Sequence, residues 1–270
     1  MWKEVDLILI GTFICLSISS FFLLVALVKI ILQPRKRKWK REFRQCFLVT
    51  VLFTSFLVSQ YWPGKIETVE TAPIISIPKY EGKAVVEVNH NIPYFSKADL
   101  RQKPFEVYQP LDVLGRARMG YALLGPETLP KAERESIGMV KPSGWRISKY
   151  DFIDGKYLYN RCHLIAYELS GQNANELNLI TGTRQLNVEG MLPYENKVTA
   201  YIRKTGHHVL YRVRPLYEGN ELVARGVLME ARSIEDGGMG IHFCVFCFNI
   251  QKGVRIDYQT GKNGLNRSFA

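Results

Sequence analysis

This chain of 270 residues has few cysteines and no internal sequence repeat. Of the five cysteines, Cys244 and Cys247 form a CxxC pair, but they lie in an alternating aromatic stretch typical of a strand. Residues i and i+3 of a strand point to opposite faces, which excludes a shared metal or a disulfide between them. No internal repeat is present, so a repeat architecture is also excluded. The length suits one domain of ordinary size plus an additional segment.

Charge is missing from Leu7–Val28, a run of 22 residues. As a helix at about 1.5 Å per residue, the run would span roughly 33 Å, enough for a bilayer core. No clear cleavage site marks it as a removable signal peptide. A basic run, Pro34–Arg44, precedes a second uncharged stretch, Gln45–Gly64, in which Tyr61 and Trp62 suit a headgroup anchor. We expect an N-terminal transmembrane helical hairpin. The alternative is a buried hairpin in a soluble protein, where helices seldom run this long without charge.

The basic run also predicts the topology. Positively charged loops stay in the cytoplasm, so both chain ends should lie outside a bacterial cell membrane. We therefore expect two transmembrane helices with a cytoplasmic loop at 34–44 within residues 1–62, a linker at 63–80, and an extracytoplasmic domain at 81–270. The net charge is +11, of which residues 1–62 carry +6. The remaining +5 permits phosphate binding without establishing it.

The rest of the chain predicts an α+β fold with a central antiparallel sheet and one prominent helix. Asp154-Gly155 is a strong hairpin signal, and residues 183–204 have helical length before Gly206. Strands are expected at 84–89, in pairs within 105–124, 150–160, 207–234 and 242–261, and at 178–181.

A possible catalytic face lies on the strand that ends near Ile165. Arg161 and His163 share one side of this strand, whereas Asn160 and Cys162 should face the other. Neutral imidazole can take a proton from water, and a guanidinium binds phosphate as a fork. This face could therefore supply both a general base and a phosphate clamp.

The following helix adds candidate metal ligands. The amide oxygen of Asn187 suits Mg²⁺, and the Glu195 carboxylate could hold the metal or its waters. Eight residues separate them, which places Glu195 about 80° around an α-helix from Asn187. Pro193 could kink the helix between them. Asn178 suits an orienting role better than direct ligation.

The pattern of these residues resembles the DNA/RNA non-specific endonuclease family of ββα-metal nucleases. It consists of Arg161, His163, Asn178, Asn187 and Glu195, in which Asn187 follows Asn178 by nine positions and Glu195 follows Asn187 by eight. The resemblance extends over about residues 77–261. It implies the ββα-metal nuclease fold and a nucleic-acid substrate held through backbone phosphates. Asn160 and Cys162 depart from the family's Asp and Gly, and we expect them to alter support and packing.

The resemblance implies single-step hydrolysis of a phosphodiester. His163 would deprotonate water, Arg161 would offset phosphoryl charge, and Mg²⁺, or Mn²⁺, would bind at Asn187 with Glu195 holding the metal or its waters. Arg116 and Arg184 are weaker candidates for substrate contact.

Three functions remain open at this point. The leading hypothesis is a membrane-anchored, sequence-non-specific endonuclease. The second is a catalytically inactive surface protein that captures DNA, and the third is a membrane structural protein with a globular ectodomain.

Overall fold

The computed structural model describes residues 24–25, 27–29, 31–32, 37–61, 76–100 and 103–266. The chain divides into two compact units, Met1–Thr71 and Ala72–Ala270. Most of the first predicted transmembrane stretch lies outside the described residues, as does most of the predicted linker.

The first unit contains α2 (Arg37–Tyr61), a helix of 25 residues. From Arg37 onward, the residues expected in the basic loop at 34–44 form the first turns of α2. Lys, Arg and Glu are good helix formers, and Lys38 lies 4.0 Å from Glu42 one turn later. Within the described parts of the chain, no helix is both long and apolar enough to cross a membrane.

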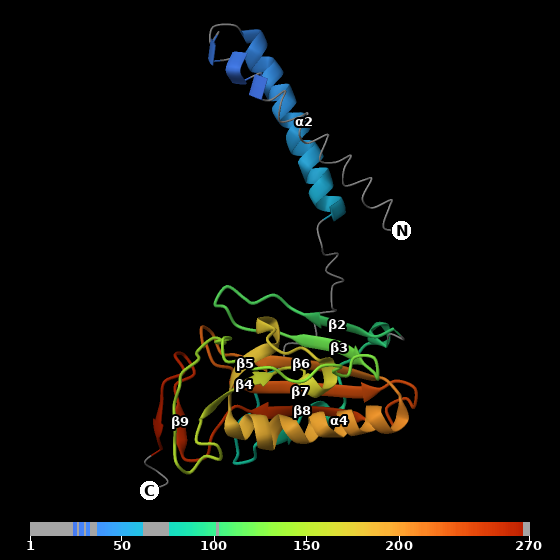
Figure 1. The fold of residues 1–270 in the computed structure, drawn as a ribbon, viewed down its shortest axis with the longest axis vertical. Helices are drawn as coiled ribbons and strands as arrows, with labels where there is room; N and C mark the ends of the chain where they lie inside the picture. The colour runs from blue at the N-terminus through green and yellow to red at the C-terminus, as the bar shows by residue number, and fades with distance from the viewer. Residues whose placement is uncertain are drawn as a thin grey trace. The chain divides into compact units, whose positions relative to one another are not determined.

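The second unit is built around a six-stranded antiparallel sheet with the order β1-β8-β7-β6-β3-β2 (Figure 1). Its strands are β1 (Val85–Glu87), β2 (Phe105–Tyr108), β3 (Gly120–Leu124), β6 (Val209–Leu216), β7 (Gly226–Ser233) and β8 (His242–Phe248). The predicted pairs within 105–124 and 207–234 are confirmed as β2–β3 and β6–β7. The α+β class with a central antiparallel sheet is thus confirmed.

Two small antiparallel pairs flank this sheet. They are β4 (Tyr159–His163) with β5 (Leu179–Thr183), and β9 (Val254–Ile256) with β10 (Asn263–Leu265). The expected pairing of the last two strands with each other is wrong: β8 inserts between β1 and β7, and β9 pairs with the unpredicted β10. The short helices are η1 (Asn89–Asn91), η2 (Lys97–Asp99), α3 (Tyr167–Ser170) and η3 (Glu176–Asn178).

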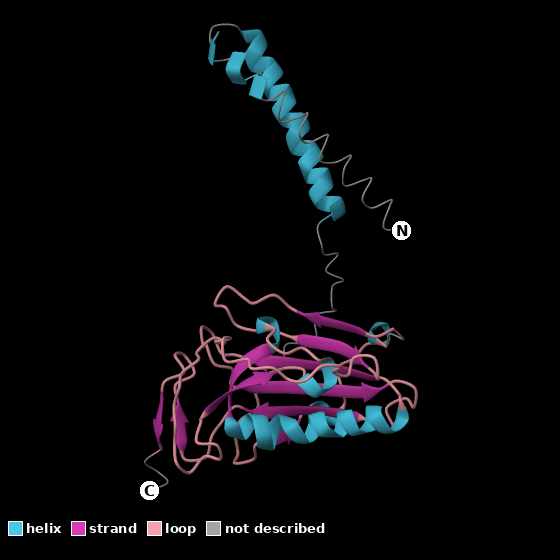
Figure 2. Cartoon of the chain, in the orientation of Figure 1, coloured by secondary structure: helices cyan, strands magenta, loops and turns pink. Residues whose placement is uncertain are grey.

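The main core lies between the sheet and α4 (Leu192–Thr205), which runs along the sheet in Figure 2. Val213, Met229 and Val245 are direct cross-strand partners on β6, β7 and β8. All three are buried in one cluster with Val198 and Ile202 of α4. Because strand residues alternate between faces, this apolar face supports the helix and the β4–β5 pair.

The opposite face of the sheet carries a second core. Cys244 belongs to this cluster, whereas Cys247 belongs to the first, and both are free thiols. The expectation that the CxxC pair points to opposite faces is confirmed. Neither cysteine is available for a shared metal.

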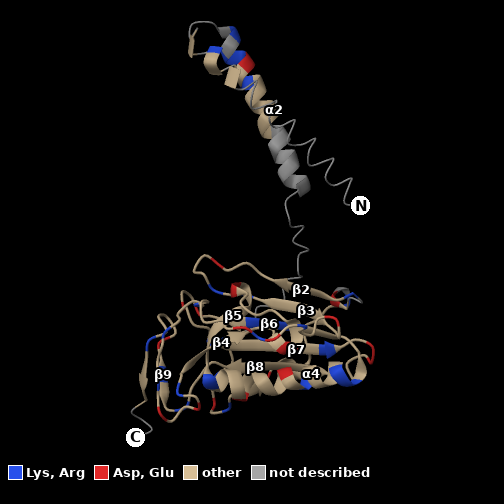
Figure 3. Cartoon of the chain, viewed as in Figure 1, with Lys and Arg blue, Asp and Glu red and all other residues tan. Residues whose placement is uncertain are grey.

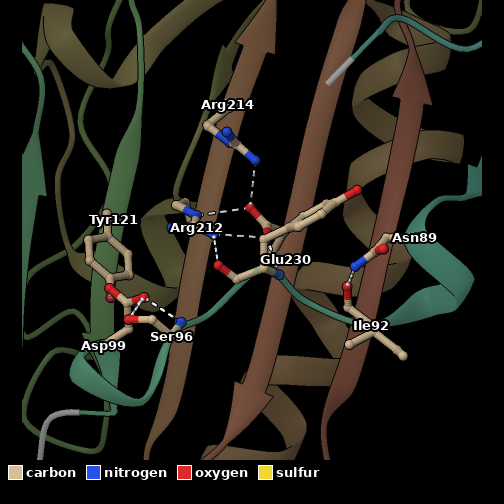
Figure 4. A network of polar contacts seen from close by, with 9 residues as sticks. Asn89, Ile92, Ser96, Asp99, Tyr121, Arg212, Arg214 and Glu230 are labelled. Atoms are coloured by element: carbon tan, nitrogen blue, oxygen red, sulfur yellow. Dashed lines mark hydrogen bonds and ion pairs between the residues drawn. The ribbon is translucent and has the colours of Figure 1, made fainter. Parts of the chain in front are cut away.

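A buried ion pair also crosses this second face (Figure 4). Arg212 on β6 donates to both carboxylate oxygens of Glu230 on β7, at 2.9 and 3.0 Å, and Arg214 adds a contact at 3.3 Å. The backbone N–H of Tyr94 donates to Glu230 at 2.8 Å, and its carbonyl accepts from Arg212 at 2.9 Å. The network therefore fastens the segment around Tyr94 to the sheet.

Candidate active site

The β4–β5 pair, together with the helix that follows, forms the framework of the site. In the register of this pair Arg161 lies opposite Thr181, and His163 lies opposite Leu179. The chain then turns directly from Thr183 into a helix that packs against the sheet. This is a strand–strand–helix unit (Figure 1), and side chains of both β4 and the helix line one cavity.

The cavity has a volume of about 620 Å³. Of the predicted site residues, those that line it are Asn160, Arg161, His163, Arg184, Asn187 and Glu195. The other lining side chains come from the preceding loops, β4, the α3 region and the start of α4: Arg134, Ile137, Trp145, Arg146, Ile147, Tyr157, Tyr159, Ala166, Tyr167, Glu168 and Leu192. Lys/Arg and Asp/Glu positions are intermixed along the loops of this unit (Figure 3), in keeping with its modest net charge.

His163 is buried, with 6% of its surface exposed. Its Nε2 lies 2.8 Å from the backbone carbonyl of Asn173. Because a carbonyl only accepts, Nε2 of the neutral ring carries the proton, and Nδ1 keeps the free lone pair. Burial lowers the pKa of His163, partly opposed by the Asn173 hydrogen bond. The ring is therefore held as a neutral base.

Asn178 fixes the chain just beyond His163. Its side chain is fully buried, its Oδ1 accepts from the backbone N–H of Ile165 at 2.8 Å, and its Nδ2 donates to the Ile165 carbonyl at 2.9 Å. With both polar atoms engaged by the backbone, Asn178 does not line the cavity. The structure places it as a support for the end of β4.

The guanidinium of Arg161, predicted to bind phosphate, is largely engaged by the protein itself. Its Nε donates to the carbonyl of Val140 at 2.5 Å and its Nη2 to that of Gly138 at 2.7 Å. Its guanidinium also stacks over Trp145, 4.1 Å from the ring centroid. Two of its three nitrogens thus hold the 138–140 loop, and only Nη1 is left to face a ligand.

Asn160 does not turn away from the site, contrary to the expectation from strand alternation. Its Oδ1 accepts from Nδ2 of Asn187 at 3.3 Å and lies 3.5 Å from Nη1 of Arg184. Cys162 is fully buried in the main core, as expected. The difference arises because Asn160 lies beside the first turn of the helix, which the sequence pattern of one strand cannot reveal.

The helix itself contains a wide turn. Residues Leu186–Met191 (η4) are π-helical, and the N–H of Leu192 donates to the carbonyl of Asn187, five residues earlier. Pro193 follows immediately; it has no N–H and would crowd the carbonyl of Glu189 in a regular helix. The wide turn accommodates this proline, where we had expected a kink.

This turn also changes how the two candidate ligands lie. A π-turn advances each residue by less than the 100° of an α-helix, so the predicted offset of about 80° between Asn187 and Glu195 shrinks. Both side chains line the same cavity. Glu195 is 7% exposed, and burial, with a smaller contribution from Glu168, raises its pKa to about 8.

Arg116 is not brought to the cavity. Its Nε donates to Asp112 at 2.6 Å, and its Nη1 donates to the carbonyls of Gly219 and Glu221 at 2.9 Å. These bonds fix the 112–116 turn. Arg184 does line the cavity, and its Nη2 lies 2.6 Å from Asp154, a largely exposed carboxylate.

Two cavity residues, Arg134 and Glu168, were not predicted from the sequence pattern. Both line the cavity, and Arg134 lowers while Glu168 raises the pKa of His163. Arg134 lies 6.0 Å from the centroid of Tyr167 and makes no hydrogen bond to another described residue. Nothing local marks Arg134 in the sequence, because a loop about 30 residues before His163 brings it here.

Comparison with known proteins identifies the fold family. The DNA/RNA non-specific endonuclease model matches residues 96–235, just over half of the chain. A deoxyribonuclease of Streptococcus dysgalactiae subsp. equisimilis is 39% identical over 110 residues, which are 39% of this chain and 32% of the relative. The chain thus spans only about a third of the length of that relative.

Two solved structures are similar. NucA from Streptococcus agalactiae, with magnesium bound, aligns at a TM-score of 0.60 and 26% identity, covering 68% of this chain and 89% of NucA. The Sda1 nuclease, with zinc bound, aligns at 0.51 and 30% identity, covering 60% and 81%. By the family model, the strand–strand–helix site and these similarities, the chain belongs to the DNA/RNA non-specific endonuclease family.

Proposed function

We propose that this chain is a Mg²⁺-dependent, sequence-non-specific endonuclease that hydrolyses phosphodiester bonds in DNA or RNA. The observation that carries the proposal is the arrangement around one cavity. A neutral base, His163, shares the cavity with an amide and a buried carboxylate, Asn187 and Glu195. A binding protein would need neither the fixed tautomer nor the paired oxygen donors.

The residues around His163 suggest how the reaction proceeds. Nδ1 of His163 would accept a proton from the attacking water, since Nε2 is already bonded to Asn173. Arg134, which has no hydrogen bond to the described protein, is the better candidate for binding phosphoryl oxygens. Arg161 would contribute through Nη1 while holding the loop, and Arg184 would contact phosphates further along.

The oxygen donors fit a hard, largely water-ligated cation. Because Nδ2 of Asn187 donates to Asn160, its Oδ1 is left for a metal. Burial raises the pKa of the Glu195 carboxyl to about 8, and a cation bound beside it would stabilise the ionised form and lower that pKa. Among the described residues no three His, Cys, Asp or Glu side chains form a metal-binding group, which suits Mg²⁺ or Mn²⁺ better than a closed zinc site. When bound, such a cation would offset phosphate charge and stabilise the leaving 3′-oxygen.

The proposal extends to location. The uncharged run 7–28, the basic run 34–44 and the closing Tyr61 and Trp62 support anchoring in a bacterial cell membrane with the nuclease domain outside. A reporter enzyme fused after Ala270 should then be active only outside the cytoplasm. Activity of that fusion inside the cytoplasm would refute this topology.

The test of function is cleavage of plasmid DNA and of RNA by the purified full chain. Degradation should require Mg²⁺, stop with EDTA, and be lost in His163→Ala, while the matched His242→Ala variant stays active. A plasmid that is shifted but uncut by the wild type would favour DNA capture instead. Arg134→Gln should slow cleavage more than Arg203→Gln, a charge change on the last turn of α4.

A further inference from the structure

One wall of the cavity is a hairpin that the proposed chemistry does not use. Residues 147–157 fold back on themselves, with Lys149 paired opposite Tyr157 and the N–H of Leu158 donating to the Ser148 carbonyl at 2.9 Å. The turn contains Lys156 at φ 66°, a left-handed conformation that is rare outside glycine. Backbone bonds on both sides of Lys156, to Ile153 and from Tyr150, hold it there at 2.7 and 2.8 Å. The hairpin is therefore held in a defined conformation by its own backbone hydrogen bonds.

This hairpin presents apolar side chains to the cavity instead of burying them. Tyr157 is 48% exposed and Ile147 is 76% exposed, yet both line the cavity. Phe152, at the tip and outside the cavity lining, is 56% exposed and packs against Tyr150 in a tilted arrangement with ring centroids 5.5 Å apart. Exposed aromatic and aliphatic side chains beside a site for an anionic polymer indicate a binding surface for a ligand with a flat apolar face.

Cations surround the same surface. The ammonium of Lys149 lies 4.6 Å from the Tyr157 centroid, and Arg146 and Arg184 line the cavity nearby. Aromatic rings interleaved with cations bind single-stranded nucleic acid, because each base offers a π-face and each phosphate a charge. In a duplex the base faces are already stacked on one another.

The position of Tyr157 fits a substrate that runs along β4. Tyr157, Tyr159, Arg161 and His163 alternate along the chain, and all four line the cavity. Six residues of extended chain span at most about 20 Å, so Tyr157 lies a few nucleotides from a phosphate held at His163.

We infer that Tyr157, backed by Lys149, is a stacking platform for an unpaired nucleobase, so that the site takes single-stranded or locally unpaired nucleic acid. The inference rests on the proposed function, since it assigns a substrate class to the same cavity. Ile147 supplies a second apolar contact beside the base. A duplex would meet the site through phosphates alone.

Binding measured without cleavage separates this inference from the proposed function. In EDTA, fluorescence anisotropy of the purified full chain would be compared for a labelled 20-nucleotide strand lacking self-complementarity and for its duplex. Tyr157→Ala should raise the single-strand Kd about tenfold and leave the duplex Kd within about twofold. The control Tyr157→Phe, which keeps the ring, should bind both as the wild type does.

An abasic scan gives a second test, whose first part uses the wild type alone. Removing single bases from the strand should weaken wild-type binding at one position, and this loss should vanish in Tyr157→Ala. Equal loss on strand and duplex, no loss in Tyr157→Ala, an abasic scan without such a position, or no binding to either probe would overturn the inference. A wild type that binds in this pattern but never cleaves with Mg²⁺ would refute the proposed endonuclease and leave the platform standing.

Discussion

Asn160 accepts a hydrogen bond from the side-chain amide of Asn187 at 3.3 Å, and this contact decides which end of that amide faces the cavity. With Nδ2 turned toward Asn160, Oδ1 is the atom presented to a cation. The replacement of the family's Asp by Asn at this position thus keeps the acceptor while removing a negative charge.

Replacing Asn160 should therefore change the metal requirement in two directions. Asn160→Ala removes the acceptor, so we expect the Mg²⁺ concentration for half-maximal cleavage to rise about tenfold, within the range known for outer residues of metal sites. Asn160→Asp keeps the acceptor and adds a charge, so that concentration should fall. Mg²⁺ titrations of initial rate measure both; an unchanged titration in Asn160→Ala would show that the contact has no role.

The activity of His163 should persist below the usual pKa of imidazole. Burial lowers the pKa of His163, so the neutral ring that acts as a base is retained to lower pH. We expect the acid limb of kcat/KM to have its midpoint below about 6.5. Glu168 raises this pKa, so Glu168→Gln should move the limb to still lower pH. Glu81→Gln, outside the cavity, is the control; movement of the limb to higher pH in Glu168→Gln would contradict the assignment.

The buried pair Arg212–Glu230 should matter for stability. Glu230→Ala leaves two guanidinium groups without their carboxylate in the sheet, and such losses cost about 3–5 kcal/mol. Urea denaturation followed by tryptophan fluorescence would measure this loss. The double variant Arg212→Leu/Glu230→Leu should lose less, because only Arg214 is then left without its carboxylate. Equal losses in the two variants would show that packing, and not charge, sets the cost.

Cys162 and Gly182 should behave as a matched pair. A Cβ added at Gly182 would lie 3.1 Å from the Cβ of Cys162 and closer still to its sulfur. Gly182→Ala should therefore lower the free energy of unfolding by about 1–3 kcal/mol. Adding Cys162→Gly should recover much of this loss, whereas Cys244→Gly should not. Additive effects of the first two substitutions would exclude the coupling.

Much of the sheet could be predicted because its signals are local. The β6–β7 hairpin follows from two alternating runs around Glu218-Gly219-Asn220. The end of α4 follows from the presence of a glycine at 206, which in the structure adopts a left-handed φ of 71°. The pairing of β8 with β1 could not be predicted in this way, since β1 is more than 150 residues away in sequence. Long-range pairing depends on the assembled core.

In the candidate site, too, only the residues with local sequence signals could be predicted. Arg161 and His163 could be placed on one face from strand periodicity alone, and both line the cavity. Arg134 could not be found, because a loop brings it to the site, and Arg116 proved to be engaged in a turn. The shared orientation of Asn187 and Glu195 depends on a change of helical pitch, which regular periodicity does not anticipate.

That change of pitch has a consequence for how the family signature is recognised. In an uninterrupted α-helix, seven residues bring two side chains back to nearly the same direction, whereas eight overshoot by about 80°. Here the wide turn Leu186–Met191 absorbs the eighth residue. A relative without this turn would present the same two groups with one residue fewer between them. Deleting one residue between Asn187 and Glu195 should thus be tolerated only if the wide turn disappears with it.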